Sequence, residues 1–332
     1  MSRVAAIGAG AWGTALADHC ARHGHQVTLW AREPDVVEHV NARRENARFL
    51  AGVTLHESLR ATGVVADAVR DADIVLFVAP SHALRAVARA TRDAVSRNAL
   101  LVVATKGIEE GTLTLMTDVI AGEIPGHSIV ALSGPSFALE VARQQPTAIV
   151  AASESVEAAV AVQHLLSSRS LRVYAQHDVT GVELGGSLKN VMALATGIVE
   201  GLGLGFNSRA ALITRGLAEM TRLGIALGAD AATFAGLAGM GDLVLTCTGS
   251  LSRNRAVGVA VGGGATLADA LAGKESVAEG VVTTRSAHAL AQRVGVQMPI
   301  VATVHRILFD GYQPREAIGD LMTRELRTES DG

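Results

Sequence analysis

The chain has 332 residues, of which 49% are hydrophobic and only 3% aromatic, and it carries a formal net charge of −3 at pH 7. This length suits two domains, and an apolar fraction built from Ala, Val, Leu and Ile favours parallel strands and closely packed helices over a barrel or a sandwich. The weakly acidic balance argues against a nucleic-acid partner, and apolar stretches as short as residues 73–80 and 99–104 predict no stable membrane insertion.

The first half of the chain alternates short β-branched runs with helical stretches. Residues 1–3 lead directly into the first run, so we expect no signal peptide. Such alternation predicts a parallel, doubly wound α/β sheet of the Rossmann type. The expected strands are residues 3–7, 26–30, 73–78, 100–104, 128–132, 147–151 and 171–175.

The second half, from about residue 178 onward, lacks strand patterns. Segments 183–198, 208–227 and 280–294 space their apolar residues as helices do, over lengths that no strand reaches. Residues 261–264, which read VGGG, indicate a loop between helices. We therefore expect a Rossmann-like NAD(P)-binding domain over residues 1–177 and an all-helical, substrate-binding domain over residues 178–332.

A glycine-rich motif follows the first expected strand. Residues 8–13 read GAGAWG, which places Gly8, Gly10 and Gly13 between a strand and an apolar helix. The first glycine allows a tight turn, the second lets the backbone approach a pyrophosphate, and the third lets the helix lie close to the strand. Because the helix N-terminus would then face the anion, this context predicts a dinucleotide cofactor.

The end of the second expected strand indicates which dinucleotide binds. An acid there would hold the ribose of NAD, whereas a basic residue would suit the 2′-phosphate of NADP. The chain has Ala31 at this place, followed by Arg32 and Glu33. We expect NADP or both cofactors, with NADP favoured. The alternative, in which Arg32 is a solvated charge and Glu33 takes the ribose, stays open.

Three of the expected strands end in unusual turns. These are residues 79–81 (APS), 105–109 (TKGIE) and 133–138 (SGPSFA). In an open α/β sheet, ligands bind beyond the carboxyl ends of the strands. Lys106 and the small residues of these turns therefore predict a place where an anion can lodge.

The helical half contains four further motifs: residues 181–190 (GVELGGSLKN), 206–209 (FNSR), 239–243 (GMGDL) and 246–254 (TCTGSLSRN). With these motifs in this order, the chain resembles the bacterial-type NAD(P)-dependent glycerol-3-phosphate dehydrogenase family, from Gly8 to about Gly280. The combination is far more specific than the glycine motif alone. The resemblance implies a reversible hydride transfer that interconverts dihydroxyacetone phosphate and sn-glycerol 3-phosphate.

The resemblance also implies the roles of individual residues. Lys189 is the expected acid/base, because reducing a ketone leaves an alkoxide that needs a proton, and a lysine in a partly desolvated site can have its pKa lowered toward neutrality. Asp242 would orient Lys189 or bind a substrate hydroxyl. Arg253 and Asn254, on a helix capped by Ser252, match the family's phosphate-binding pair. The other expected contacts are Lys106, Gly134 and Ser136 to the substrate, and Gly8, Gly10, Ala11, Trp12, Gly13, Arg32, Lys106, Ala138, Arg253, Val277 and Glu279 to the cofactor.

These residues also have plainer interpretations. Taken alone, Lys189 on an amphipathic helix is a solvated charge, and Asp242 after a glycine is a helix N-cap. Gly185, Gly186 and Gly197 are expected mainly to allow close helix packing.

The two cysteines and the 11 histidines bear on compartment and metals. Cys20 and Cys247 form no disulfide framework, which fits a reducing cytoplasm, and Cys247 is expected to be an inert small residue. The histidines show no ligand spacing, so we expect no metal.

The chain departs from the family pattern at two places. The family commonly has Tyr-Leu-Pro where this chain has residues 49–51 (FLA), and Ser where it has Thr105, which puts local contacts near the adenine and the phosphate in doubt. One alternative is a 3-hydroxyacid dehydrogenase or a ketopantoate-reductase-like enzyme, and another is a non-catalytic NAD(P) sensor, which needs no proton donor. Low charge over residues 192–204 would suit a homodimer interface. If the resemblance holds, the product sn-glycerol 3-phosphate would feed phospholipid synthesis.

Overall fold

The computed structural model describes residues 1–273, 278–323, 325 and 328–329, and contacts divide the chain into two compact units. The first unit contains Met1–Lys106 and Thr114–Val182, and the second contains Gly107–Leu113 and Glu183–Gly332. The short segment Gly107–Leu113 thus packs with the helical part of the chain, although no pattern in the sequence predicts this. That residues 1–177 and 178–332 form separate functional domains stays a prediction.

The described residues of the first unit form an eight-stranded sheet in the order β3-β2-β1-β4-β5-β6-β7-β8. The central strands are buried on both faces, as the apolar runs in the sequence require. In β1, Val4 and Ala6 contribute to one core, and Ala5 and Ile7 contribute to the other. The strands are β1 (Arg3–Ile7), β2 (Gln26–Trp30), β3 (Arg60–Thr62), β4 (Ile74–Phe77), β5 (Leu100–Val103), β6 (Ile129–Ser133), β7 (Thr147–Ala152) and β8 (Leu171–Gln176).

The expectation of a wholly parallel sheet is wrong at one pair, because β6 and β7 run antiparallel. Between them the chain makes only α6 (Ala138–Ala142), a five-residue helix, and turns at Gln144, whose φ is 56°. Such a helix is about 7.5 Å long, too short to carry the chain back across the sheet, so β7 starts at the edge where β6 ends.

Strand β3 was not expected from the sequence. It has three residues, too few to show a periodic pattern. The side chain of Asn41 binds both backbone groups of Ala61, through its Nδ2 at 2.9 Å and its Oδ1 at 2.9 Å. The strand is therefore held from α2 (Pro34–Arg43), and this tertiary contact has no local signature.

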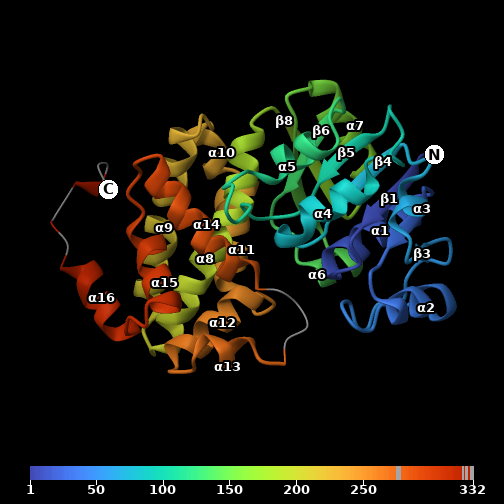
Figure 1. The fold of residues 1–332 in the computed structure, drawn as a ribbon. Helices are drawn as coiled ribbons and strands as arrows, with labels where there is room; N and C mark the ends of the chain where they lie inside the picture. The colour runs from blue at the N-terminus through green and yellow to red at the C-terminus, as the bar shows by residue number, and fades with distance from the viewer. Residues whose placement is uncertain (274–277, 324, 326–327, 330–332) are drawn as a thin grey trace. The chain divides into compact units, whose positions relative to one another are not determined.

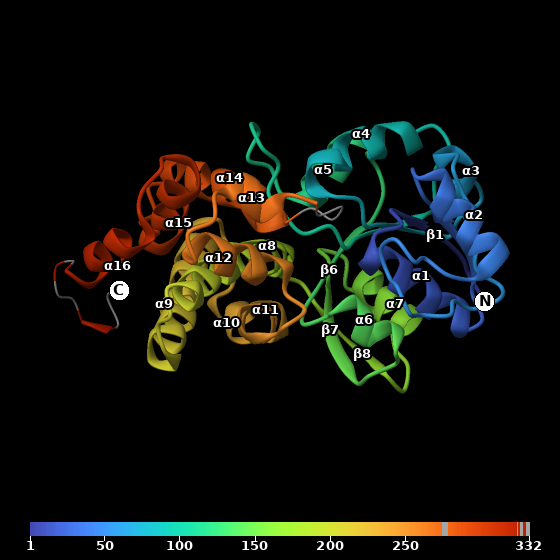
Figure 2. The ribbon, with the colours of Figure 1, turned by 90° about the horizontal axis from the view of Figure 1, so that it is seen from below.

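Helices cover both faces of the sheet. Figure 2 shows α3 (Val65–Val69), α4 (Ser81–Thr91) and α5 (Met116–Glu123) on one side of the strands. On the other side lie α1 (Ala11–Arg22), α6 and α7 (Val156–Leu166). This doubly wound arrangement confirms the α/β, Rossmann-like part of the predicted fold.

In the second unit, the regular elements from α8 onward among the described residues are all helices (Figure 1). Its first helix, α8 (Val179–Gly201), is buried at every residue from 181 to 199. Residues 192–199 are thus buried within the chain itself and are not available as the interface suggested for them. The other helices are α9 (Phe206–Ala226), α10 (Ala231–Ala235), the π-helix η1 (Leu237–Gly241), α11 (Asp242–Thr248), α12 (Arg253–Gly262), α13 (Leu267–Leu271), α14 (Glu279–Arg293), α15 (Pro299–Phe309) and α16 (Pro314–Met322).

The prediction of a loop over residues 261–264 is wrong for residues 261 and 262. Helix α12 continues through Gly262, and the chain turns only at Gly263 and Gly264, where φ reaches 101°. A Cβ on Gly262 would overlap the carbonyl oxygen of Ile198, so this glycine serves helix contact rather than a turn. In the described part of the chain, no helix is long and apolar enough to cross a membrane.

Candidate active site

The glycine motif forms the turn from β1 into α1. Gly8 has a φ of 124°, and a Cβ on it would lie 2.8 Å from the backbone nitrogen of Ala79 on the neighbouring chain segment. A Cβ on Gly13 would overlap the carbonyl oxygen of Gly8, whereas one on Gly10 would meet nothing within 4 Å. The motif therefore has two packing glycines and one open position at the start of α1, which is where a pyrophosphate approaches the backbone.

A buried polar network supports this turn. Asn46 donates from its Nδ2 to the carbonyl of Ala9 at 2.9 Å and to the hydroxyl of Thr14 at 2.8 Å, and Thr14 donates to the same carbonyl at 3.1 Å. The indole Nε1 of Trp12 is buried and has no hydrogen-bond partner among the described residues. An unused donor beside an open, uncapped helix N-terminus fits an anionic dinucleotide, so the residues present match the expected cofactor.

The end of β2 carries the residues expected to read the ribose. Ala31 is fully buried, and its amide donates to the carbonyl of Thr62 at 3.1 Å. The side chain of Arg32 is 80% exposed and donates from Nε and Nη2 to Oε1 of Glu33, at 3.1 and 2.8 Å. Arg32 thus presents an exposed cation at the surface, with Glu33 as its partner.

Three expected substrate residues of the first unit lie together. The ammonium of Lys106 donates to the carbonyl of Gly134 at 3.3 Å, and the hydroxyl of Ser136 donates to the same carbonyl at 2.9 Å. Gly134 has a φ of 129°, and a Cβ on it would lie 2.9 Å from Cα of Ile149, so no other residue fits there without strain. Ala138 begins α6 and packs on the same core as Ala11 and Trp12 at the start of α1.

The second unit buries a charged pair. Lys189 on α8 and Asp242 on α11 form a hydrogen-bonded ion pair, with side chains 10% and 0% exposed. The plainer interpretation of Lys189 as a solvated charge is therefore wrong, and Asp242 is the first residue of α11, one position after its N-cap Gly241. A buried ion pair is costly to desolvate, so its presence in the core indicates a role other than stability.

A π-helix places Asp242 opposite Lys189. Residues Leu237–Gly241 form η1, directly before α11 begins at Asp242. A Cβ on Gly185, one turn before Lys189 on α8, would overlap the carbonyl oxygen of Ala238 in η1. Gly185 therefore acts in close packing, as expected, and π-helical turns of this kind occur frequently at functional sites.

The expected phosphate pair lies at the start of α12. Ser252 caps this helix by accepting from the backbone nitrogen of Arg255 at 3.3 Å, which confirms the predicted cap. Asn254 donates from Nδ2 to Oδ1 of Asn190 at 2.9 Å, and its own Oδ1 accepts from the backbone nitrogen of Gly280 at 3.0 Å. Asn254 therefore links α12 to α8 and to α14.

Arg253 and Glu279 complete the described part of this site. Arg253 is exposed at the first position of α12, and Glu279 is the half-buried first residue of α14. Partial desolvation lowers the pKa of Arg253 from its usual value of 12.5, and the negative charge of Glu279 opposes this shift. An arginine stays cationic at neutral pH in either case. The other expected cofactor residue in this region, Val277, lies outside the described residues.

Sequence reasoning missed three polar residues at the site. Thr246 donates to the backbone carbonyl of Asp242 at 2.6 Å and lies 3.5 Å from its Oδ1. Its position four residues after Asp242 on one helix was the available signal. Asn190 follows Lys189 directly in the GVELGGSLKN motif, but Asn46 lies in a loop that nothing in the sequence connects to the glycine motif.

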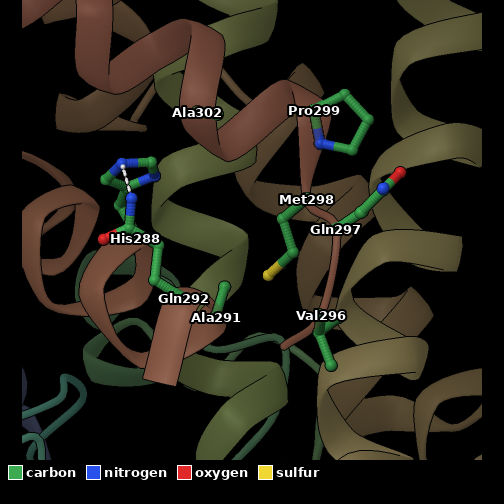
Figure 3. A pocket seen from close by; sticks show the side chains of 8 residues that line it. All are labelled: His288, Ala291, Gln292, Val296, Gln297, Met298, Pro299 and Ala302. Carbon is green, nitrogen blue, oxygen red and sulfur yellow. Dashed lines mark hydrogen bonds between the residues drawn. The ribbon is translucent and has the colours of Figure 1, made fainter. Parts of the chain in front are cut away.

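Cys247 lies on the same helix as Asp242. Burial raises the pKa of its thiol to about 12, and the expectation that this side chain is inert stays a prediction. Among the described residues, no group of His, Cys, Asp or Glu is arranged to hold a metal. A cavity of about 330 Å³ in the second unit, shown in Figure 3, is lined by none of the expected site residues. Its lining residues are His288, Ala291, Gln292, Val296, Gln297, Met298, Pro299 and Ala302.

Comparisons with known proteins agree with this geometry. Two family models match the chain: the N-terminal region of NAD-dependent glycerol-3-phosphate dehydrogenase over residues 3–159, and the C-terminal region of the same enzyme over residues 178–319. The chain is 51% identical over 330 residues to the glycerol-3-phosphate dehydrogenase [NAD(P)+] of Citrifermentans bemidjiense, covering 98% of both chains. It is 52% identical to the enzyme of the same name from Geobacter sulfurreducens, again covering 98% of each.

Solved structures show the same similarity. The glycerol-3-phosphate dehydrogenase of Coxiella burnetii superposes with a TM-score of 0.94 at 40% identity, covering 97% of this chain and 99% of that one. The glycerol-3-phosphate dehydrogenase of Saccharomyces cerevisiae gives a TM-score of 0.82 at 28% identity, with the same coverage. A ketopantoate reductase from Ralstonia eutropha is only 17% identical, with a TM-score of 0.63, and shares the fold alone.

Proposed function

The chain belongs to the NAD-dependent glycerol-3-phosphate dehydrogenase family, and from this membership we propose how its own residues carry out the reaction. It is an NAD(P)-dependent oxidoreductase that interconverts dihydroxyacetone phosphate and sn-glycerol 3-phosphate. When bound, the nicotinamide cofactor would supply the hydride to C2 of the three-carbon phosphate, or accept it in the reverse direction. The buried Lys189–Asp242 pair is the observation that best supports the assignment of roles below.

Lys189 is proposed as the acid/base. Reduction of the ketone places negative charge on the C2 oxygen, and an ammonium in a dry site can donate a proton to it and take the proton back in the reverse direction. Asp242 holds the ammonium in place through their hydrogen bond, and Thr246 lies beside the same carboxylate. Pairing with Asp242 also lowers the cost of keeping the cation of Lys189 buried before the substrate arrives.

The N-terminal turn of α12 is proposed to bind the substrate phosphate. Arg253 offers a planar set of N–H donors, and the first turn of a helix has amides without intrahelical partners. The side-chain amide of Asn254 is bonded at both ends, to Asn190 and to Gly280. We therefore expect Asn254 to contribute its backbone amide to the phosphate, while its side chain holds α12 in place.

The first unit is proposed to bind the dinucleotide. The amides at Gly10 and Ala11 and the indole of Trp12 would hold the pyrophosphate region, with Gly8 and Gly13 shaping the turn. Arg32 would bind the 2′-phosphate of NADP, and releasing its exposed pairing with Glu33 costs little. With NAD, which has no 2′-phosphate, Glu33 would instead bind a ribose hydroxyl, and this fits use of both cofactors.

The experiment that tests these roles follows the absorbance of reduced nicotinamide with dihydroxyacetone phosphate and NADPH or NADH. Lys189→Met removes the proton donor, and Lys189→Arg keeps a cation that does not titrate near neutral pH. We expect both variants to lose about a hundredfold or more in kcat. Activity that survives in the folded variants would remove Lys189 from proton transfer, and a wild-type protein inactive with both cofactors would overturn the substrate assignment.

Three broader properties are also proposed. The product would enter phospholipid synthesis, the enzyme would work in the cytoplasm, where its buried thiols Cys20 and Cys247 stay reduced, and it would form a homodimer. The apolar side chains of Leu204 and Phe206, which are 37% and 82% exposed, are better interface candidates than the buried residues of α8. Light scattering on a Phe206→Ser variant against the wild type tests this last point.

A further inference from the structure

A second charged cluster in the helical unit is formed by Glu200, Arg209 and Arg255, none of which has a role in the proposed reaction. Glu200 stands at the end of α8, and its Oε2 and Oε1 accept from Nε and Nη2 of Arg255 at 3.0 and 2.9 Å. Nη2 of Arg209, on α9, lies 3.2 Å from Oε2 of the same carboxylate. The three side chains are only 28%, 17% and 19% exposed, so this is not a solvated surface pair.

The cluster gives a role to a motif that the reaction leaves unused. Arg209 closes the FNSR motif of residues 206–209, and its guanidinium lies 5.5 Å from the ring centre of Phe206. With two guanidinium groups on one carboxylate, Glu200 has both oxygens engaged. A bidentate Arg–carboxylate pair fixes the relative direction of its two side chains, which a lysine pair does not.

Arg255 is two residues from Arg253 on α12. Its backbone nitrogen also donates to the capping hydroxyl of Ser252 at 3.3 Å. Within a single helical turn, Arg255 is therefore fixed by its backbone to the cap and by its side chain to α8. Because Arg253, Asn254 and Arg255 are consecutive in the first turn of α12, a change in how Arg255 is held also affects the placement of its two neighbours.

The contact between α8 and α12 is otherwise made largely by glycines. A Cβ on Gly197 would overlap the carbonyl oxygen of Arg255, and one on Gly258 would overlap that of Leu194. Farther along, Gly201 and Gly262 meet the partner helix in the same way. Backbones that meet through glycines pack closely, and at these four positions no side chain of the glycine helix interlocks with its neighbour.

Two directional links bridge these helices. One is the Asn190–Asn254 hydrogen bond beside Lys189, and the other is the Glu200–Arg255 pair. Asn190 and Glu200 are ten residues apart on α8, which corresponds to about 15 Å along the helix axis. Two fixed points at this separation set both the rotation and the axial position of α12, which one hydrogen bond alone does not.

We propose that Glu200 is a positioning residue for the phosphate-binding turn, acting through Arg255, and that Arg209 holds the carboxylate of Glu200 in the geometry this requires. The inference rests on the proposed role of Arg253 and Asn254. It assigns Glu200 no contact with the substrate and no part in proton transfer. Its loss therefore weakens recognition of the phosphate group and leaves the chemical step intact.

The test compares Glu200→Gln with the wild type and with Asp320→Asn. Asp320, on α16, is a control carboxylate that also serves two partners, Arg306 and the hydroxyl of Tyr312, and its helix packs on α15. For each protein we would measure kcat, the KM for dihydroxyacetone phosphate, the KM for NADPH, and the inhibition constant of inorganic phosphate competing with the substrate.

We expect Glu200→Gln to raise the KM for dihydroxyacetone phosphate and the inhibition constant of phosphate together, about tenfold, which corresponds to roughly one bidentate charged interaction. The kcat and the KM for NADPH should change less than about twofold, and Asp320→Asn should leave all four values unchanged. Glu200→Asp, which keeps the charge, should recover part of the loss. Should Glu200→Gln fail to fold, Arg255→Lys replaces it, with the same expected pattern.

A fall in kcat and a rise in both KM values to the same degree, or a lower melting temperature with an unchanged KM for dihydroxyacetone phosphate, would overturn the proposal. These results differ from failure of the proposed function, which would appear as absence of turnover in the wild type. They also differ from failure of the phosphate assignment, in which an Arg253→Ala variant would keep its affinity for inorganic phosphate.

Discussion

Replacing Gly197 with alanine tests whether α8 and α12 touch through their backbones. In the structure, a Cβ at this position would overlap the carbonyl oxygen of Arg255 and would lie 2.9 Å from both Cα of Gly258 and the nitrogen of Val259. All three are backbone atoms, so no flexible side chain can move aside. The two helices would have to separate, and the phosphate-binding turn on α12 would move with them.

Two opposing effects set the magnitude. Alanine is favoured over glycine inside a helix by about 1 kcal/mol, whereas forcing an extra carbon into a packed core costs about 1–3 kcal/mol. Because the overlap is with backbone, the upper part of that range applies, and we expect a net loss of about 2 kcal/mol. For a unit of this size, such a loss lowers the melting temperature by about 4–8 °C.

A matched control separates the two effects. Gly319 lies within α16 in the same unit, and a Cβ on it would meet nothing within 4 Å. Gly319→Ala should therefore show only the helix preference, a gain of about 1 kcal/mol. Calorimetric melting of both variants decides the sign, and the KM for dihydroxyacetone phosphate should rise for Gly197→Ala alone. If Gly197→Ala instead melts above the wild type, the argument from backbone contact is refuted.

Three further predictions concern charge. Asp242→Asn leaves the buried ammonium of Lys189 without its carboxylate. The free energy of unfolding should therefore fall by about 3–5 kcal/mol, and kcat should fall by about a hundredfold or more. A variant with wild-type stability would contradict the burial argument. Burial lowers the pKa of His19 from 6.5 to about 4, so below pH 6.5 the unfolded chain binds a proton that the folded chain does not. Stability should therefore drop by up to about 3 kcal/mol between pH 6.5 and 4, and His19→Gln should flatten this part of the unfolding profile. Arg32→Ala should raise the KM for NADPH severalfold and leave the KM for NADH nearly unchanged, whereas equal changes in both would place Arg32 away from the 2′-phosphate.

The sequence predicts the fold well where local pattern decides it. The glycine motif, the apolar strands and the long apolar helix at residues 181–199 each follow from residue types and their period. The direction of β7 does not, because an apolar run of six residues looks the same in a parallel and an antiparallel pair. That direction depends on the length of the preceding connection and on the turn at Gln144.

The same distinction applies to the site. Lys189, Asp242 and Arg253 were found through motifs, but the burial of Lys189 was not foreseen when it was considered alone, although the apolar residues on every face of its helix already indicated a core position. Asn46 supports the glycine motif from 37 residues away along the chain, and no local sequence pattern predicts that contact. Pattern thus identifies which side chains carry the chemistry, whereas tertiary contacts decide how each is held.

Helix α8 explains why this chain places a charged pair in a core. Lys189 and Asn190 are consecutive, so their side chains point about 100° apart around the helix and reach different neighbours. Lys189 meets Asp242 on α11, while Asn190 meets Asn254 on α12. Contact with both partners requires a wide covered arc of the helix, and α8 is buried at every residue from 181 to 199. The glycines at 185, 197 and 201 then follow, because neighbours come close enough for these short polar contacts only where the helix has no side chain.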